Sequence, residues 1–149
     1  SNEIVDALVS SRPEKIHVIL ERLEAISEFV KLKESETLSS ANKRVSNILK
    51  KADKISINPI DENLLIENEE IMLHKVLLDL EPKINQCLIK NDFISALKNL
   101  VILNTPINNF FEKVMVNADD SKIKNNRYSL LFKLRQNLNC VADISKLAS

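Results

Sequence analysis

The chain has 149 residues, which suits one domain with a substantial core. Its 21 basic and 21 acidic residues cancel, and glycine is absent, which excludes the glycine-rich loops that bind nucleotide phosphates. No apolar run approaches the roughly 20 residues that span a bilayer, so we expect no membrane partner.

The two cysteines, Cys87 and Cys140, lie in apolar helical patterns and not at metal-binding spacing. We interpret them as buried free thiols, which are typical of a reducing compartment such as the cytoplasm. The sequence does not begin with methionine, and Ser1-Asn2 is a candidate remnant of tag cleavage. We therefore expect a fragment of a longer protein, with residues 1–149 forming a single domain.

Apolar residues recur at helical spacing along most of the chain. After a short apolar segment from Ile4 to Val9, Pro13 suits the first turn of a helix, where its missing N–H costs no hydrogen bond. Ser35 is a candidate cap for the next helix. The apolar rows of these two helices are Ile16, Ile19, Leu20, Leu23, Ile26 and Val30, then Leu38, Ala41, Val45, Ile48, Leu49 and Ala52.

Residues 53–66 interrupt the pattern around the turn signal Asn58-Pro59, so we expect a loop there. A helix then begins near Asn68 and keeps one apolar phase across Pro82. Because proline removes a backbone hydrogen bond, this segment is either a kinked helix or two helices in line. The predicted buried row is Leu73, Val76, Leu77, Leu80, Ile84 and Leu88.

Three further helices follow, each with its own start signal. The signals are Asn91 or Asp92, then Thr105-Pro106, then Asp120 or Ser121. The predicted inward positions are Phe93, Ala96, Leu97, Leu100 and Val101, then Ile107, Phe110, Phe111 and Val114, then Ile123, Leu130, Leu131, Leu134 and Leu138. The sequence therefore predicts an all-α fold, a single bundle of about six to seven helices.

The neutral total hides two oppositely charged regions. Residues 61–81 carry seven acidic side chains against Lys75, a local charge of −6. Residues 122–146 carry six basic side chains against Asp143, a local charge of +5. Within the acidic region we interpret Glu69-Glu70 as a charged helix start, which the helix dipole favours, and not as a catalytic pair.

The segment ANKRVSNILKKADK, residues 41–54, is also basic. Its polar row is displaced by two positions from its apolar row, about 200° around a helix, so the polar row faces away from the core. Like charges at this spacing slightly destabilise a helix. The row is therefore either ordinary solvated surface or a surface for a polyanion. It consists of Lys43, Asn47, Lys50, Lys51 and Lys54, with Arg44 at its edge.

The sequence shows no arrangement typical of a catalytic or metal site. His17 and His74 are far apart, without a suitably placed carboxylate or cysteine, and we expect His17 at the surface. The aromatic pair Phe110-Phe111 either packs in the core or stacks on nucleic-acid bases.

Four segments in order, ANKRVSNILKK, FFEKVMVNADD, NNRYSLLFKLR and VADISKL, resemble the C-terminal domain of the bacterial glycyl-tRNA synthetase β subunit. The resemblance extends over the chain from about Ile4. It implies an all-helical anticodon-binding domain of the DALR type, related in fold to that of arginyl-tRNA synthetase. It also implies membership of an α2β2 ligase that makes glycyl-tRNA from glycine, ATP and tRNA. The α subunit of that enzyme holds the aminoacylation site, so the resemblance implies no cofactor in this domain.

The resemblance also implies which residues contact tRNA, and it favours the polyanion interpretation of the basic row. Asn47 has the alternative role of holding two helices together. The family usually has valine-aspartate before its phenylalanine pair, whereas this chain has Ile107-Asn108, so Asn108 can form a hydrogen bond but carries no charge. The family's motif positions fall on Asn42, Lys43, Arg44 and Asn47 of the basic helix and on Arg127 of the last helix.

The last helix offers a second group of candidate contacts. Lys124, Tyr128 and Arg135 lie near one line on its surface, with Arg127 beside it. Glycine anticodons share two cytosines, whose recognition needs a cationic donor and an oxygen acceptor. Tyr128 could stack on a base, and an arginine could bind the acceptor edge of that base. Asn108 or Asn109 could accept from the amino group of the base. In the alternative, Tyr128 packs at the bundle edge and Arg135 pairs with an acid on another helix.

Two functions therefore compete. One is a tRNA-binding module of glycyl-tRNA synthetase, with glycine tRNA and, through the full-length β subunit, the α subunit as partners. The other is a helical protein-interaction or assembly module without RNA contact, whose acidic residues 61–81 meet a basic partner. The clustered basic helices favour the first. The low aromatic content of 4% weakly favours the second, because single-stranded loops are usually held by stacking. The candidate tRNA-binding residues are Lys43, Arg44, Asn47, Lys50, Lys51, Asn108, Lys124, Arg127, Tyr128 and Arg135.

Overall fold

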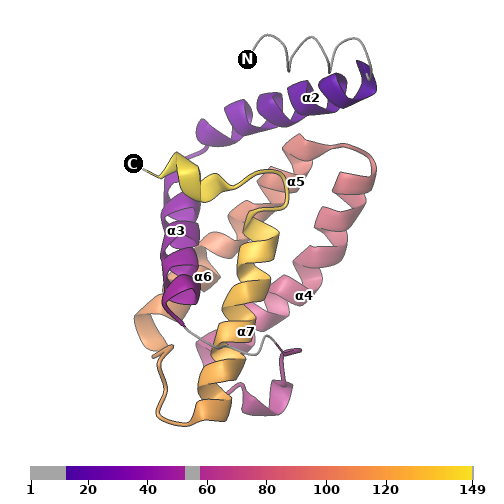
Figure 1. The fold of residues 1–149 in the computed structure, drawn as a ribbon. Helices are drawn as coiled ribbons and strands as arrows, with labels where there is room; N and C mark the ends of the chain where they lie inside the picture. Colours follow the sequence, from indigo (N-terminus) through magenta and orange to yellow (C-terminus); the bar gives the residue numbers. More distant parts are fainter. Residues whose placement is uncertain (1–12, 53–57, 149) are drawn as a thin grey trace.

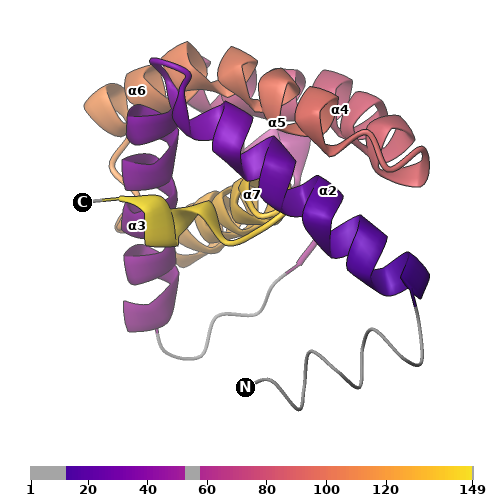
Figure 2. The same cartoon turned by 90° about the horizontal axis from the view of Figure 1, so that it is seen from above.

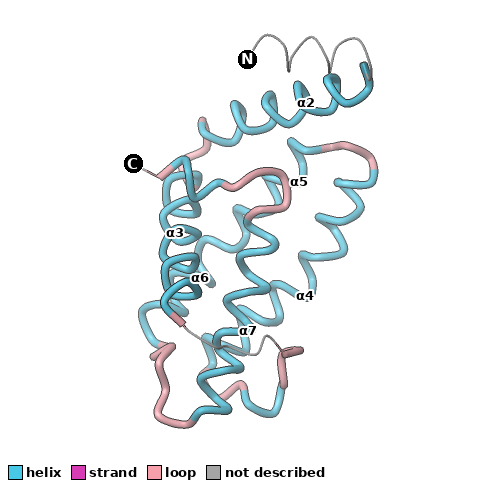
Figure 3. Tube along the Cα trace, in the orientation of Figure 1, coloured by secondary structure: helices cyan, strands magenta, loops and turns pink. Residues whose placement is uncertain are grey.

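The computed structural model describes residues 13–52 and 58–148. Over these residues the chain is helical and contains no strand (Figure 3). The all-α prediction is confirmed. The α-helices are α2 (Pro13–Val30), α3 (Ser35–Lys51), α4 (Asn68–Ile89), α5 (Phe93–Asn99), α6 (Asn104–Lys113) and α7 (Ser121–Leu138), and the 3-10 turns are η1 (Glu62–Leu64), η2 (Leu100–Leu103) and η3 (Ile144–Leu147).

Helices α4 and α7 run along the long direction of the molecule, and α2 lies across one end of them (Figure 1). Seen from that end, α2 crosses over the bundle, and it packs mainly against α5 (Figure 2). Helix α3 packs against α7 but is tilted away from the long direction, since Figure 2 shows it lengthwise. After α7 the chain returns beside α3, where η3 packs. The C-terminal turn thereby lies beside both α3 and the end of α7.

The core consists of the apolar rows that face the centre of this bundle. The rows predicted for α3, α4 and α7 are confirmed, because every member of them is buried or half-buried. Helix α7 is also buried outside its row, at Asn126, Arg127, Tyr128 and Ser129. The residues of these rows that are buried are Leu38, Ala41 and Val45, then Leu73, Leu77, Leu80 and Ile84, then Leu130, Leu131, Leu134 and Leu138.

The apolar row predicted for α2 is not its buried face. The buried residues of α2 are Ala25 and Phe29, which are both 1% exposed. Since α2 crosses the end of the bundle, only the side carrying these two residues meets α5, and most of the apolar row faces outward. The exposed members of that row are Ile19, Leu20, Leu23 and Val30.

A polar contact also holds α2 in place. Arg22 Nη1 donates a hydrogen bond of 2.7 Å to the carbonyl oxygen of Val141, at the turn before η3. The same guanidinium lies 4.5 Å from the ring centre of Phe93, the first residue of α5. This arginine therefore joins α2 to α5 and to the C-terminal segment.

Two of the predicted helix caps are confirmed. Asp92 Oδ1 accepts from the backbone N–H of Ser95 at 3.2 Å, and Asp120 Oδ1 accepts from the N–H groups of Lys122 and Ile123. These carboxylates satisfy N–H groups that have no partner within the helix.

The caps predicted at Ser35 and Thr105 are wrong. Helix α3 already includes Ser35, whose hydroxyl donates to the carbonyl oxygen of Val30. Helix α6 begins at Asn104, because the chain passes directly from η2 into it and needs no separate cap.

Helix α4 runs through Pro82 as one α-helix, which decides between the two arrangements that the sequence allowed. At its end Asn91 has a φ of 55°. Asparagine tolerates this left-handed conformation better than most residues, so it makes the α4–α5 turn in a chain without glycine.

The predicted loop is irregular in its described part, 58–66, apart from η1. Residues 53–57, including Lys54, and the apolar segment from Ile4 to Val9 lie outside the described residues. No helix in the described ranges is long and apolar enough to cross a membrane. Both cysteines are free and half-buried, and burial raises the pKa of the Cys140 thiol to about 11.

Candidate nucleic-acid interface

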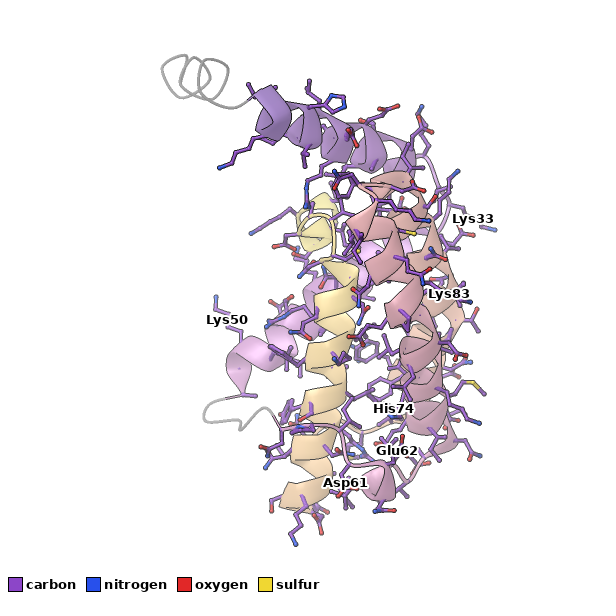
Figure 4. All side chains as sticks on the ribbon, turned by 90° about the vertical axis from the view of Figure 1, so that its right-hand side faces the viewer. Lys33, Lys50, Asp61, Glu62, His74 and Lys83 are labelled. Atoms are coloured by element: carbon purple, nitrogen blue, oxygen red, sulfur yellow. The ribbon has the colours of Figure 1, made fainter. Side chains whose placement is uncertain are left out.

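The outer face of α3 is basic, as the helical wheel predicts. Lys43, Arg44, Asn47, Lys50 and Lys51 are all exposed, opposite the row that packs into the core. Figure 4 shows Lys50 on one side of the molecule and Lys33 and Lys83 on the other. The α3 face is therefore available to a ligand.

The helix-joining role considered for Asn47 belongs to Asn42 instead. Asn42 is fully buried, and its Nδ2 donates to Asn139 Oδ1 at 2.6 Å. It lies three residues before Val45, on the buried row, whereas Asn47 lies on the exposed one. This contact joins α3 to the end of α7.

A hollow of about 1080 Å³ separates the basic face of α3 from α7 and the C-terminal turn. Its volume is ample for a nucleotide, since ligand sites are typically about 300–1,000 Å³. Cationic side chains from three separate segments meet there, which makes the hollow electropositive. They are Lys43 and Lys50 from α3, Arg135 from α7 and Lys146 from η3.

Arg135 does not pair with an acid of a neighbouring helix, so that alternative is wrong for the described residues. Its guanidinium carbon lies 5.4 Å from the ring centre of Phe132, one turn earlier on α7. Phe132 also lines the hollow. An arginine and an aromatic ring are therefore placed where they could contact an unstacked base.

A second, smaller hollow of about 600 Å³ lies between α3 and α6. It brings together Arg44 and Asn108, two predicted contacts from different helices. The Arg44 guanidinium lies 4.2 Å from the ring centre of Phe111, and this cation–π contact fixes its position. Glu36 and Glu112 also line this hollow, so it is less positive than the first.

The aromatic pair at 110–111 has two different environments. Phe110 is fully buried, which confirms core packing for this ring. Phe111 is half-buried and meets Phe110 edge to face, with ring centres 5.4 Å apart. The Arg44 guanidinium lies over the Phe111 ring. Phe111 therefore positions this cation and is covered by it.

Arg127 lies inside the bundle and not at its surface. Its side chain is 7% exposed, and its Nη2 lies 2.8 Å from Oε1 of Glu70, whose side chain is fully buried. Its Nη1 donates to the carbonyl oxygen of Met115. Arg127 therefore holds α7 against the start of α4 and is not placed to touch RNA.

Tyr128 is 4% exposed, and its hydroxyl donates to Asn117 Oδ1. It packs, as in the alternative interpretation, and cannot stack on a base. Lys124 lies with its Nζ 5.9 Å from the Tyr128 ring centre. It is separated from Arg135 by eleven residues of α7, about 16 Å along the helix. The structure thus does not place the three residues in one contact surface.

Other hollow-lining residues were not predicted from the sequence. Among them are Phe132, Asn139, Asp143 and Lys146. Phe132 lies within the segment NNRYSLLFKLR, Asp143 and Lys146 lie within VADISKL, and Asn139 lies between these two segments of the resemblance. The basic region 122–146 and the resemblance therefore mark these parts of the sequence, but they do not show which residues face α3.

The acidic and basic regions meet each other within the chain. Besides Glu70 and Arg127, Glu81 Oε1 of α4 lies 3.3 Å from Lys133 Nζ of α7.

The two histidines each lie near a single carboxylate. His74 Nε2 lies 3.2 Å from Glu62 Oε1, and exposed His17 lies 2.8 Å from Glu21 (Figure 4 labels His74 and Glu62). Among the described residues no group of three or more histidine, cysteine, aspartate or glutamate side chains could hold a metal ion.

An all-helical bundle with a basic, partly aromatic hollow defines a class of domain suited to binding nucleic acid. The chain belongs to the DALR anticodon binding domain family, whose model matches residues 38–144.

Its relatives are glycine–tRNA ligase beta subunits. It is 44% identical over 149 residues to that of Ralstonia nicotianae, covering 100% of this chain and 21% of the relative. It is 43% identical over 145 residues to that of Dechloromonas aromatica, covering 97% and 20%. It is 40% identical over 149 residues to that of a Janthinobacterium species, covering 100% and 21%. The chain thus spans about a fifth of the length of these relatives.

Proposed function

We propose that this domain binds the anticodon region of glycine tRNA as part of a glycine–tRNA ligase β subunit. The observation that carries the proposal is the basic hollow, where Lys43 and Lys50 of α3 meet Arg135 of α7. Cations alone would hold phosphates, whereas Arg135 beside Phe132 can also contact a base. Family membership supports the anticodon as the target.

The proposed contacts fall into two groups. The main hollow and the exposed side of α3 hold Lys43, Asn47, Lys50, Lys51 and Arg135, to which we add Lys146. Arg44 and Asn108 form a second group in the neighbouring hollow. Lys124 lies farther from the main hollow, and it is a candidate for contact with a phosphate farther along the RNA.

The names of the relatives support the wider role. We propose that the domain serves an α2β2 enzyme that glycylates tRNA with ATP in the cytoplasm. In that enzyme the α subunit would contact the rest of the β subunit and carry the aminoacylation site. The described residues of this domain would then act only by holding the tRNA in place.

The assembly alternative depends on an acidic surface that seeks a basic partner. Two carboxylates of the acidic region, Glu70 and Glu81, already pair with Arg127 and Lys133 of α7. These two of the region's seven carboxylates are therefore neutralised within the domain, which reduces the charge left for a basic partner and favours the tRNA proposal.

We expect the double variant Lys43→Glu, Lys50→Glu to bind glycine tRNA more weakly and with less salt dependence. Each phosphate contact to single-stranded RNA contributes a slope of about −0.7 in a plot of log K against log salt concentration. If each lysine meets one phosphate, the slope should become shallower by about 1.4. Filter binding across a salt series measures both quantities.

The matched control is the double variant Lys33→Glu, Lys83→Glu. It makes the same change in net charge at two exposed lysines on the other side of the molecule (Figure 4). Equal weakening in both double variants would show that only net charge matters, and the proposed α3 surface would be wrong.

A further inference from the structure

We infer that Asp143 reads the base in the main hollow, by accepting a hydrogen bond from the exocyclic amino group of a cytosine. Arg135 would donate to the acceptor edge of the same base. This inference rests on the proposed function and adds a specificity-determining residue to it.

Asp143 is the one carboxylate among the described residues that line the main hollow. The hollow otherwise gathers four cationic side chains. A site that only held phosphates would gain nothing from a carboxylate, because it repels an anion and weakens the field of the nearby lysines. The carboxylate therefore suits a ligand group that donates a hydrogen bond.

The local fold does not require the charge of Asp143. Asp143 caps η3 with its Oδ1, which accepts from the backbone N–H of Ser145 at 3.1 Å and from the Ser145 hydroxyl. Asparagine or serine caps a helix about as well as aspartate. The cap occupies Oδ1, and a carboxylate has a second oxygen that can accept another hydrogen bond.

Arg135 and Asp143 line the same hollow, but they do not form an ion pair with each other. A donor group and an acceptor group thus remain apart across the hollow. Asn139 Oδ1 is occupied by Asn42, which leaves the Asn139 amide N–H groups as donors beside Arg135. The hollow therefore offers donors on α7 and an acceptor on the C-terminal turn.

Cytosine matches this arrangement better than uracil or adenine does. Its pairing edge carries an amino donor at one end and two acceptors beside it. Uracil has a carbonyl oxygen in place of the amino group, which would face the Asp143 carboxylate and be repelled. Adenine has the amino donor but only one acceptor on that edge, so it would use fewer of the α7 donors.

The test compares Asp143→Asn with the unsubstituted chain, using glycine tRNA and two variants in which one anticodon cytosine is changed to uracil. We expect the preference for cytosine over uracil at one of these positions to fall about fivefold or more, the lower end for a good base contact. Because an asparagine amide can also donate, the uracil variant should bind the substituted chain more tightly than the unsubstituted one. A merely structural role for Asp143 would not produce that gain.

The control is Asp92→Asn, which changes the cap of α5 and does not line the hollow. A second variant, Asp143→Ser, keeps a capping oxygen but lacks the amide, so it should lose the preference without binding the uracil variant more tightly. An unchanged preference in both Asp143 variants, with normal tRNA affinity, would overturn the inference and leave the proposed function intact. Failure of the unsubstituted chain to bind tRNA would overturn both, and unfolding of both Asp143 variants would make the carboxylate a structural requirement.

Discussion

Replacing Arg127 by alanine should lower the free energy of unfolding by about 3–5 kcal/mol, the usual cost of removing one partner of a buried ion pair. The Glu70 side chain is fully buried, and Arg127 is its cationic partner at 2.8 Å. Glu70 Oε1 also accepts from the backbone N–H of Glu67, so the carboxylate is held at the start of α4. Without Arg127 that charge stays in the interior uncompensated. Urea unfolding followed by circular dichroism measures the change.

The double variant Arg127→Met, Glu70→Leu is the control for this explanation. It removes both charges and fills the space with apolar atoms, so it should be less destabilised than Arg127→Ala, even though the Glu67 N–H loses its partner. If the double variant is as unstable as the single one, the cost comes from lost packing and not from a buried charge. Neither result depends on tRNA, so the experiment separates the structural role of Arg127 from RNA binding.

Replacing Arg135 by alanine should remove about 1–3 kcal/mol of discrimination between glycine tRNA and a variant with one anticodon cytosine changed to uracil. Arg135 lies in the main hollow against Phe132, where its guanidinium can bind two acceptors of a base. The quantity to measure is the ratio of the two affinities, because a phosphate contact would weaken both tRNAs about equally.

Arg135→Lys is the matched variant. Lysine keeps the positive charge but cannot form two parallel hydrogen bonds with a base. We therefore expect it to retain most of the overall affinity while losing discrimination, as the alanine variant does. If Arg135→Lys discriminates as well as the unsubstituted chain, Arg135 acts as a charge and does not read the base.

The fold was predictable where one side of a helix meets the bundle, as in α3 and α4. It was less so in α2, which is apolar on two sides. The row of Ile19, Leu20 and Leu23 is more apolar than the row of Ala25 and Phe29, yet the second row is buried. Periodicity shows that a helix has apolar faces, but which face is covered depends on how it crosses its neighbours.

The candidate site was predictable in its α3 part and not in its α7 part. Arg127 is a candidate contact in the sequence analysis because a motif position of the resembling family falls on it. It nevertheless lies four residues before Leu131 and seven before Leu134, on the buried row of α7. The same spacing argument applies to Asn42, which lies three residues before Val45 on the buried row of α3. The main hollow was beyond prediction because its walls come from three segments that only the tertiary fold brings together.

The account depends most on the claim that the main hollow and the α3 face bind the anticodon region of glycine tRNA. The direct measurement is the affinity of the 149-residue chain for glycine tRNA and for an unrelated tRNA at two salt concentrations. We expect both affinities to fall as salt rises, because phosphate contacts are common to both tRNAs. Glycine tRNA should bind more tightly at each concentration, because base contacts are not screened in the same way. Equal affinity for the two tRNAs at both concentrations, or no binding of either, would contradict the account.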